Sequence, residues 1–423
     1  MADLIIKGGI VLTMDDAVIG NASVVVDKGL IKYVGKDTKE KADKVIDARG
    51  CVVMPGLINS HTHVPMTLFR GVADGLSYAE WMKKIQKLET KLTPSDVRSG
   101  AYLGVLEMIR SGTTTFVDMY FHEDEVAHVV EETGIRAALG YGMIEGMNED
   151  ADTKLKIREK FVKKWNGAAD GRITTMYAPH SAASCSREFL IKVKALAARD
   201  NSGVHIHVLE TEDELKTMKK RYGMCSINLL DSIGMLGPGL LAAHCIFLSD
   251  DDIDILKEKE VNVVHCPSSN MALGAGVAPV PKMLGKGINI VLGTDGVASS
   301  GSLDMWKEMR CASLLHRLED PAAMPSSKVI EMATKNGARA LGINSGVLKP
   351  GYLADIIIVD IRKPQFASAD IISSLVNVAT GCDVKTSIVN GRVLMEDRMV
   401  TIFDENKIIE NAREAMIRIT EKN

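Results

Sequence analysis

Two histidines, His61 and His63, are separated by one residue, and this spacing suggests metal chemistry. They follow residues 52–58, an apolar run rich in β-branched side chains that is typical of a fully buried strand. On an extended chain, the side chains of positions i and i+2 point to the same side. Both imidazoles can therefore reach one ion, and neutral imidazole is a common ligand of Zn²⁺. Two histidines on a surface loop would show the same spacing, so the rest of the chain has to support this interpretation.

Two further apolar runs carry side chains at their ends that could complete a metal site. His207 lies near the end of one run and Asp295 at the end of another, and with His61 and His63 they would give four ligands. A catalytic zinc ion keeps one more position for water. His205 lies on the same face as His207 but two residues deeper, so we interpret it as a core histidine. Asp295 stands in a Gly-Thr-Asp-Gly sequence, where turn formation alone would also explain an aspartate.

Three other residues are candidates for roles beside the metal. Glu210 follows His207 closely and can lie in the site without binding the ion, although it would also suit the acidic first turn of a helix. His244 ends the next strand and is a candidate base, although a core histidine would also fit. The run 172–180 contains no lysine that could be carbamylated and bridge two metals. We therefore expect one metal, and we interpret His180 as a substrate contact.

The segments that carry these residues alternate between apolar strands and helices. The eight expected strands are residues 52–58, 113–118, 135–140, 172–180, 203–208, 240–245, 261–267 and 288–295. Eight such units predict an α/β fold with a (β/α)₈ barrel. A doubly wound open sheet is the alternative, but it would collect its ligands at one switch point. Here, polar residues follow almost every strand at its carboxyl end, as the catalytic face of a barrel requires.

Both ends of the chain are rich in short strands and lie outside the predicted barrel. Asn390-Gly391 is a strong signal for a hairpin turn, and residues 405–419 form an amphipathic pattern that predicts a terminal helix. We expect residues 1–57 and 345–423 to form one small discontinuous β-sandwich domain with a C-terminal helix. Residues 58–344 would then form the catalytic barrel.

The composition excludes several classes of partner. The net charge of −4, from 51 basic and 55 acidic residues, implies no broad basic surface for nucleic acid. No apolar run reaches the length of about 20 residues that a membrane span requires. Residues 1–9 have no basic region before an apolar core, so we expect no signal peptide. The seven scattered cysteines favour reduced thiols and therefore a cytoplasmic protein. From the charge and the apolar runs, we expect no nucleic-acid and no membrane partner.

Taken together, these motifs resemble the amidohydrolase superfamily, in its mononuclear deaminase branch. The general motifs are residues 55–63, His207 with Glu210, residues 243–245 and residues 292–296. Closer motifs at residues 66–74, 116–123, 178–181 and 267–274 resemble the methylthioadenosine/S-adenosylhomocysteine deaminases. The archaeal 5′-deoxyadenosine deaminases belong to that group. The resemblance covers nearly the whole chain.

The resemblance implies a role for each candidate residue. Four residues match the ligands of one divalent metal per chain, which we expect to be zinc: His61, His63, His207 and Asp295. Three match catalytic residues: Glu210, His244 and Asp295. Four match substrate contacts: Glu89, His180, Glu210 and Asp295. In the family, the residue at the position of Glu89 holds the ribose hydroxyls. Without the resemblance, Glu89 would be read as a solvated charge on a lysine-rich helix.

The implied reaction is hydrolytic deamination of 5′-modified adenosines, namely 5′-deoxyadenosine, methylthioadenosine, S-adenosylhomocysteine and adenosine, in recycling of S-adenosylmethionine by-products. Asp295 and His244 would take a proton from water, and protonated Glu210 would donate to N1 of the purine. The alternatives are a guanine deaminase or a chloro-s-triazine hydrolase, which share the metal set, and a non-enzymatic scaffold. Glu89 favours a ribosyl substrate, and the complete ligand set argues against a scaffold. The resemblance also implies a homo-oligomer, either a dimer or a tetramer.

One position departs from the family pattern. Family members that bind the amino-acid carboxylate of S-adenosylhomocysteine carry an arginine after the third strand, and the matching residue here is Tyr141. A tyrosine hydroxyl cannot replace a bidentate guanidinium. We therefore expect small 5′ groups to be accepted at least as well as S-adenosylhomocysteine, unless a loop cation such as Lys154 takes the place of the arginine.

Overall fold

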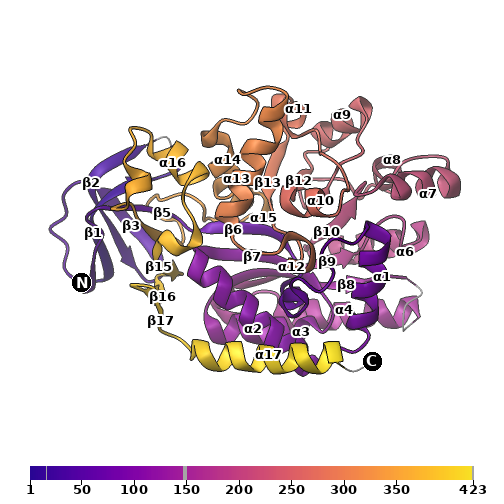
Figure 1. Cartoon of the computed structure of the whole chain (residues 1–423), viewed down its shortest axis with the longest axis horizontal. Coiled ribbons are helices and arrows are strands. Elements are labelled where there is room, and N and C mark those ends of the chain that lie inside the picture. The colour runs from indigo at the N-terminus through magenta and orange to yellow at the C-terminus, as the bar shows by residue number, and fades with distance from the viewer. Residues whose placement is uncertain (16, 146–149, 422–423) are drawn as a thin grey trace.

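The protein is described here by a computed structural model, which covers residues 1–15, 17–145 and 150–421. Figure 1 shows a barrel of strands surrounded by helices, with a second sheet at its left that contains the N-terminus. The barrel strands are β6 (Leu57–Thr62), β7 (Thr113–Tyr120), β8 (Arg136–Met143), β9 (Ile173–Pro179), β10 (Gly203–Val208), β11 (Leu240–His244), β12 (Asn262–His265) and β13 (Asn289–Leu292).

These strands are parallel and follow one another in chain order around the sheet. The last strand returns to the first, because the backbone N–H of Asp295 donates to the carbonyl oxygen of His61 over 2.9 Å. The strands are buried almost throughout, since side chains fill the inside of the barrel and helices cover its outside. The predicted (β/α)₈ barrel is confirmed.

Helices link the strands and cover the outside of the barrel (Figure 1). The longer ones are α1 (Tyr78–Glu89), α2 (Pro94–Ser111), α3 (Glu123–Thr133), α4 (Ala151–Trp165), α6 (Arg187–Arg199), α7 (Glu212–Tyr222), α9 (Asp250–Glu258) and α13 (Met305–Leu315). The shorter ones are η1 (Val64–Phe69), α5 (Ala168–Gly171), α8 (Ser226–Ser232), α10 (Pro267–Ala272), α11 (Val280–Gly285), α12 (Val297–Ser300), η2 (His316–Leu318), α14 (Ser326–Met332), α15 (Lys335–Leu341), η3 (Pro364–Phe366), α16 (Ile371–Asn377) and η4 (Gly381–Asp383). Within the described ranges, no helix has the length and apolar character needed to cross a bilayer.

Helix α6 illustrates how the sequence produces these elements. Its buried side chains recur at helical spacing: Phe189, Leu190, Val193 and Ala197. The side chain of Ser186 accepts a hydrogen bond from the backbone N–H of Phe189 and caps the first turn. The apolar stripe packs against β9 and β10. Helix α3 carries a similar stripe, with Val126, Ala127, Val129 and Val130 buried, and it packs against β8 and β9.

The two chain ends form one mixed sheet beside the barrel. Its strands are β1 (Ala2–Leu12), β2 (Val18–Asp27), β3 (Leu30–Gly35), β4 (Ala42–Asp47), β5 (Cys51–Pro55), β14 (Ile356–Asp360), β15 (Val384–Val389), β16 (Arg392–Glu396) and β17 (Met399–Val400). The antiparallel pair of β5 and β14 joins the two ends. Asn390 and Gly391 link β15 to β16 with φ angles of +51° and +75°, as a two-residue hairpin turn requires. The prediction that both chain ends combine outside the barrel is confirmed, and so is the hairpin.

The apolar run 52–58 is two strands, not the single strand that we expected. Strand β5 ends at Pro55 and belongs to the chain-end sheet, whereas β6 begins at Leu57 and belongs to the barrel. Gly56 stands between them, and a Cβ atom there would lie 2.0 Å from Oγ1 of Thr114. The run is continuously apolar because the chain passes from one buried sheet directly into the next.

The predicted C-terminal helix is α17 (Glu405–Glu421), which is two residues longer than expected. It lies along α2 of the barrel rather than on the chain-end sheet (Figure 1). Its buried side chains form one stripe: Ile408, Ala412, Ala415 and Ile419. Lys91 Nζ also donates to the carbonyl oxygen of Ile419 over 3.1 Å. The division of the chain into two domains at residues 58 and 344 stays a prediction.

Candidate active site

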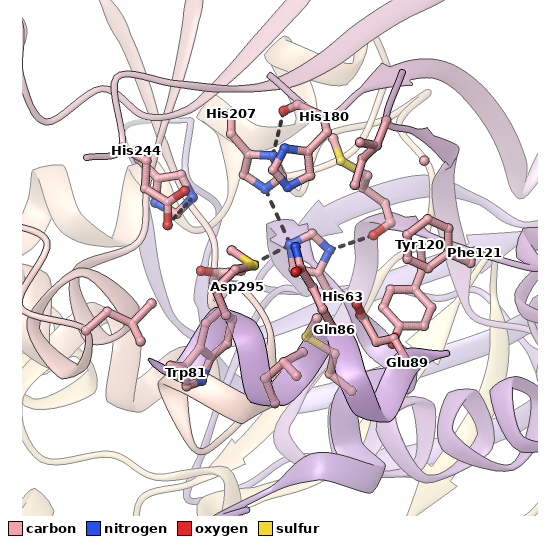
Figure 2. Close-up of a pocket in the computed structure, with 18 of the residues that line it drawn as sticks. His63, Trp81, Gln86, Glu89, Tyr120, Phe121, His180, His207, His244 and Asp295 are labelled. Atoms are coloured by element: carbon pink, nitrogen blue, oxygen red, sulfur yellow. Dashed lines mark hydrogen bonds and ion pairs between the residues drawn. The ribbon is translucent and has the colours of Figure 1, made fainter. Parts of the chain in front are cut away.

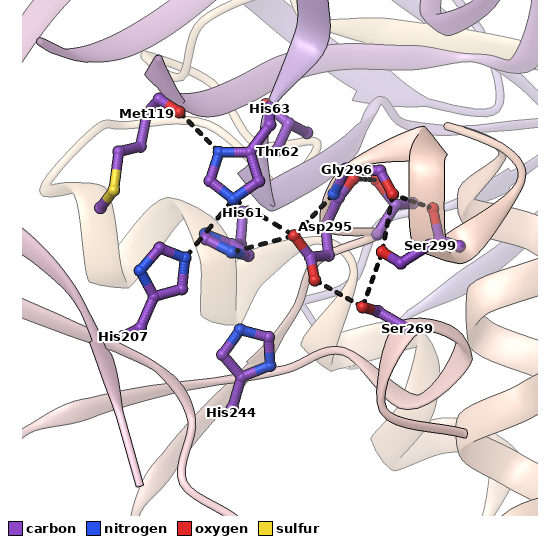
Figure 3. Close-up of polar contacts among 12 residues, drawn as sticks. His61, Thr62, His63, Met119, His207, His244, Ser269, Asp295, Gly296 and Ser299 are labelled. Carbon is purple, nitrogen blue, oxygen red and sulfur yellow. Dashed lines mark hydrogen bonds and ion pairs between the residues drawn. The ribbon is translucent and has the colours of Figure 1, made fainter. Parts of the chain in front are cut away.

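The four predicted metal ligands meet at the carboxyl end of the barrel. His61 lies in β6 and His207 in β10, whereas His63 and Asp295 stand just beyond β6 and β13. The Oδ1 atom of Asp295 is 3.4 Å from Nε2 of His61 and 3.3 Å from Nε2 of His63. The Nε2 atoms of His63 and His207 are 3.4 Å apart. Figure 3 shows the four side chains pointing toward one another.

The hydrogen bonds of the histidines fit a divalent ion. Nδ1 of His63 lies 2.5 Å from the carbonyl oxygen of Met119, and Nδ1 of His207 lies 2.7 Å from that of His180. A carbonyl oxygen only accepts, so each Nδ1 carries a hydrogen, and each Nε2 faces the cluster, where its lone pair can bind an ion. Nε2 of His61 is buried and has no hydrogen-bond partner in the described part of the chain. Three imidazole nitrogens and one carboxylate are the donor set of a mononuclear metal site.

Asp295 gives the cluster its negative charge. Burial raises the pKa of Asp295, but the neighbouring imidazoles of His61 and His63 outweigh burial and hold the pKa well below its usual 3.8. Burial likewise lowers the pKa of His63, yet the Asp295 carboxylate raises it to about 9. The Oγ atom of Ser269 donates to Oδ2 of Asp295 over 2.5 Å and fixes the carboxylate. The cluster therefore favours positive charge between the carboxylate and the imidazoles.

Glu210 and His244 lie beside the ligands, as expected for a proton-transfer pair. Tyr78 donates its hydroxyl hydrogen to Oε2 of Glu210 over 3.1 Å. Nδ1 of His244 lies 2.9 Å from the amide oxygen of Asn270. Burial raises the pKa of Glu210, which favours the protonated form that a general acid needs. The sequence pattern alone gives no sign of the roles of Tyr78 and Asn270, which contact residues far away in the chain.

A cavity opens above the cluster, between the strand ends and helix α1 (Figure 2). Its apolar lining residues include Met66, Trp81, Met82, Ile85, Phe121 and Leu273. Glu89, at the end of α1, also lines the cavity, and Figure 2 shows it on the opposite side of His63 from His244. Burial raises the pKa of Glu89 to about 7. The cavity thus has two polar sides. One side carries the four candidate ligands, which we call the metal-type cluster, together with Glu210 and His244. The other side carries the carboxylate of Glu89.

Comparison with known proteins identifies the family. Residues 52–394 match the model of the amidohydrolase family. The chain belongs to this family. The predicted resemblance is confirmed, and the match covers every residue that we assigned to the site.

The amidohydrolase is similar to deaminases over nearly its whole length. It is 55% identical, over 98% of both chains, to the 5′-deoxyadenosine deaminase of Methanosarcina acetivorans. It is 45% identical, over the whole of both chains, to the 5-methylthioadenosine/S-adenosylhomocysteine deaminase of Pelotomaculum thermopropionicum. Among solved structures, it matches an adenosine deaminase from Xanthomonas campestris with bound zinc, at a TM-score of 0.96, 30% identity and 99% coverage of both chains. The histidine-rich cluster and this zinc-containing neighbour support a divalent metal in the amidohydrolase.

His180 lies against the cluster of this amidohydrolase but outside its donor set. Its ring lines the cavity, with the ring centroid 4.6 Å from that of His207. Burial lowers the pKa of His180 to about 4, so the imidazole is neutral. A neutral ring at the cavity wall is compatible with contact to a substrate, and this role of His180 stays a prediction.

A second cavity of about 770 Å³ adjoins the first and shares Glu89 with it. Tyr141 and Lys154 both line this second cavity. The Lys154 ammonium donates to the carbonyl oxygen of Ile144. Arg158, which our sequence analysis did not single out, places its guanidinium 4.2 Å from the centre of the Tyr141 ring. Arg158 follows Lys154 by four residues, so the two side chains lie on one face of α4. This spacing is the sequence pattern that could have indicated Arg158.

Proposed function

We propose that this amidohydrolase binds one zinc ion per chain and hydrolyses 5′-modified adenosines to the corresponding inosines and ammonia. The observation that carries the proposal is the position of Glu89 in the same cavity as the metal-type cluster and Glu210. A carboxylate can accept hydrogen bonds from both hydroxyls of a ribose. The apolar walls between Glu89 and the cluster suit the planar purine. The site thus offers one group for each part of a nucleoside.

The chain's own residues would divide the chemistry as follows. A divalent ion held by His61, His63, His207 and Asp295 would act as a Lewis acid and make water a nucleophile near neutral pH. The amide oxygen of Asn270 only accepts hydrogen bonds, so Nδ1 of His244 donates to it. Nε2 of His244 can then accept a proton from the water.

Glu210 would supply the acid that activates the purine for attack. Burial keeps its carboxyl group protonated to a higher pH than usual, and the Tyr78 hydroxyl holds one of its oxygens. Donation of the Glu210 proton to N1 of the purine makes C6 more open to attack by water. His244 would then pass the proton taken from water to the amino group, which leaves as ammonia. The hydroxyl hydrogen at C6 would return to Glu210 as the 6-oxo product forms, so one water is consumed for each ammonia released.

The proposed substrates are 5′-deoxyadenosine, methylthioadenosine, S-adenosylhomocysteine and adenosine. Support comes from the names of the similar deaminases and from their coverage of the whole chain. We further propose that the enzyme recycles by-products of S-adenosylmethionine in the cytoplasm as a homo-oligomer, a dimer or a tetramer. The family resemblance and the scattered cysteines support this setting.

A substrate panel tests the proposal. Zinc-loaded enzyme is mixed separately with the four nucleosides, with guanine and with a chloro-s-triazine, and the release of ammonia or chloride is followed. The proposal predicts one ammonia per nucleoside and no turnover of guanine or the triazine. Faster turnover of guanine or the triazine than of every nucleoside would refute it.

A further inference from the structure

His205 is a histidine beside the metal-type cluster that the proposed mechanism does not use. It lies in β10, and both its side chain and that of His61 are completely buried. The Nε2 atom of His205 is 2.8 Å from the Nδ1 atom of His61. The two rings meet edge to face at an interplanar angle of 89°. The expected core histidine is therefore buried, but it also makes a direct polar contact with a predicted ligand.

The direction of this contact follows from the other two histidine ligands. Nδ1 of His63 and Nδ1 of His207 each donate to a backbone carbonyl, of Met119 and His180 respectively. His61 has no such carbonyl, and its Nδ1 contacts a side chain instead. If His61 is to present the Nε2 lone pair to a metal, its Nδ1 has to carry the hydrogen. The Nε2 atom of His205 must then accept that hydrogen.

This arrangement leaves the other nitrogen of His205 without a partner. A neutral His205 that accepts at Nε2 carries its own hydrogen on Nδ1, and this atom is buried with no hydrogen-bond partner in the described ranges. An unpaired buried donor is unfavourable, so an aliphatic side chain would serve better if packing were the only task. The contact with His61 explains why a histidine stands at this position.

We propose that His205 is a positioning residue that accepts the Nδ1 hydrogen of His61 and thereby holds the Nε2 atom of His61 toward the metal. The inference rests on the proposed ligand set. Partners of metal-binding histidines orient the ring and strengthen the ligand, and their loss typically weakens metal binding 10- to 100-fold. His63 and His207 donate to backbone carbonyls, whereas His61 contacts a side chain. Among the histidine ligands described, His61 is therefore the one whose partner can be changed by mutation.

The test measures zinc affinity without any nucleoside. Metal-free enzyme is titrated with zinc in competition with a chromophoric chelator, and thermal unfolding of the metal-free chain checks that each variant is folded. His205→Leu removes the acceptor, and we expect zinc affinity to fall about 10- to 100-fold. His205→Gln keeps an oxygen near the position of Nε2, and we expect an affinity close to that of the wild type.

His265→Leu is the matched control. His265 also ends a barrel strand and is completely buried, but neither of its ring nitrogens has a hydrogen-bond partner within the described ranges. We expect its replacement to leave zinc affinity unchanged. Should His205→Leu fail to fold, His205→Asn takes its place, because its shorter amide does not reach Nδ1 of His61 and the same loss is expected.

Two results would overturn the inference. Wild-type affinity in the folded His205→Leu or His205→Asn variant would show that no hydrogen bond is needed. Equal losses in His205→Gln and the acceptor-free variant would show that only the packing of the ring matters. His61→Ala separates this inference from the proposed function: if it keeps zinc, the ligand set itself is wrong, whatever the His205 variants do.

Discussion

The Nε2 atom of His244 lies 3.9 Å from the Oε1 atom of Glu210. The second polar atom of each side chain has its own partner: Nδ1 of His244 contacts Asn270, and Oε2 of Glu210 accepts a hydrogen bond from Tyr78. One base-type nitrogen and one acid-type oxygen therefore face the same space beside the metal ligands. Water and the purine C6 would meet in that space.

Replacement of Glu210 by Gln separates proton transfer from metal binding. The side chain of Glu210 contacts Tyr78 and His244 in the described part of the chain and is not one of the four candidate ligands, so Glu210→Gln should keep close to one metal per chain. Turnover should drop by roughly 10²-fold or more, since the proton donor is lost. Metal analysis and steady-state kinetics on the same sample check this, and the exposed Glu212→Gln serves as the control. A metal-free Glu210→Gln protein would mean that Glu210 is a ligand.

His207 and His180 differ in the expected effect of their removal. His207→Ala removes one of three imidazole donors, so both metal and activity should be lost. His180→Ala should keep the metal and raise the KM for the nucleoside, because His180 lines the cavity without joining the donor set. Metal content per chain, measured for both variants, decides between these roles. A metal-free His180→Ala or a metal-loaded His207→Ala would reverse them.

Ribose selectivity should depend on pH through Glu89. Burial raises the pKa of Glu89 to about 7. Above that pH the carboxylate is ionised and can accept from both ribose hydroxyls, whereas below it the protonated group loses acceptor capacity. The ratio of kcat/KM for adenosine to that for 2′-deoxyadenosine should therefore rise as pH increases through this value. Glu89→Gln should remove the trend, and a ratio that does not change with pH in the wild type would contradict the role of Glu89.

The 5′ end of the substrate is tested at Tyr141. Because Tyr141 replaces an arginine, a charge-assisted contact to S-adenosylhomocysteine is lost. Such a loss costs roughly 1.5–3 kcal/mol of binding free energy, which lowers kcat/KM by about one to two decades. We expect kcat/KM for 5′-deoxyadenosine and methylthioadenosine to equal or exceed that for S-adenosylhomocysteine. Tyr141→Arg should improve S-adenosylhomocysteine selectively. If the wild type prefers S-adenosylhomocysteine tenfold or more, a cation of the second cavity holds its carboxylate, and Arg158 and Lys154 are the residues to change next.

The barrel and its ligands could be predicted because their signals are local. The strand at residues 203–208 has the predicted bounds, and its alternation places His207 on the inner face. The break at Gly56 could not be predicted, since an apolar run does not reveal that it passes from one sheet to another. At the break, a side chain at position 56 would collide with Thr114, a neighbour that only the folded chain brings there.

The rest of the site depends on contacts between distant residues. Glu89 stands among lysines on α1, and its sequence neighbours suggest a solvated charge. It faces the cavity only because α1 crosses the strand ends. Tyr78 meets Glu210 across 132 residues of chain, and His205 meets His61 across 144. Spacing along the chain cannot indicate such pairs, so the structure was needed to find them.

Titration of metal-free enzyme with zinc, with the rate of ammonia release from 5′-deoxyadenosine as the signal, tests whether one zinc ion makes the chain a deaminase. We predict that activity rises in proportion to added zinc and stops rising at one equivalent per chain. A break at two equivalents would contradict the single-metal site, and no release of ammonia at any zinc loading would contradict the deaminase itself.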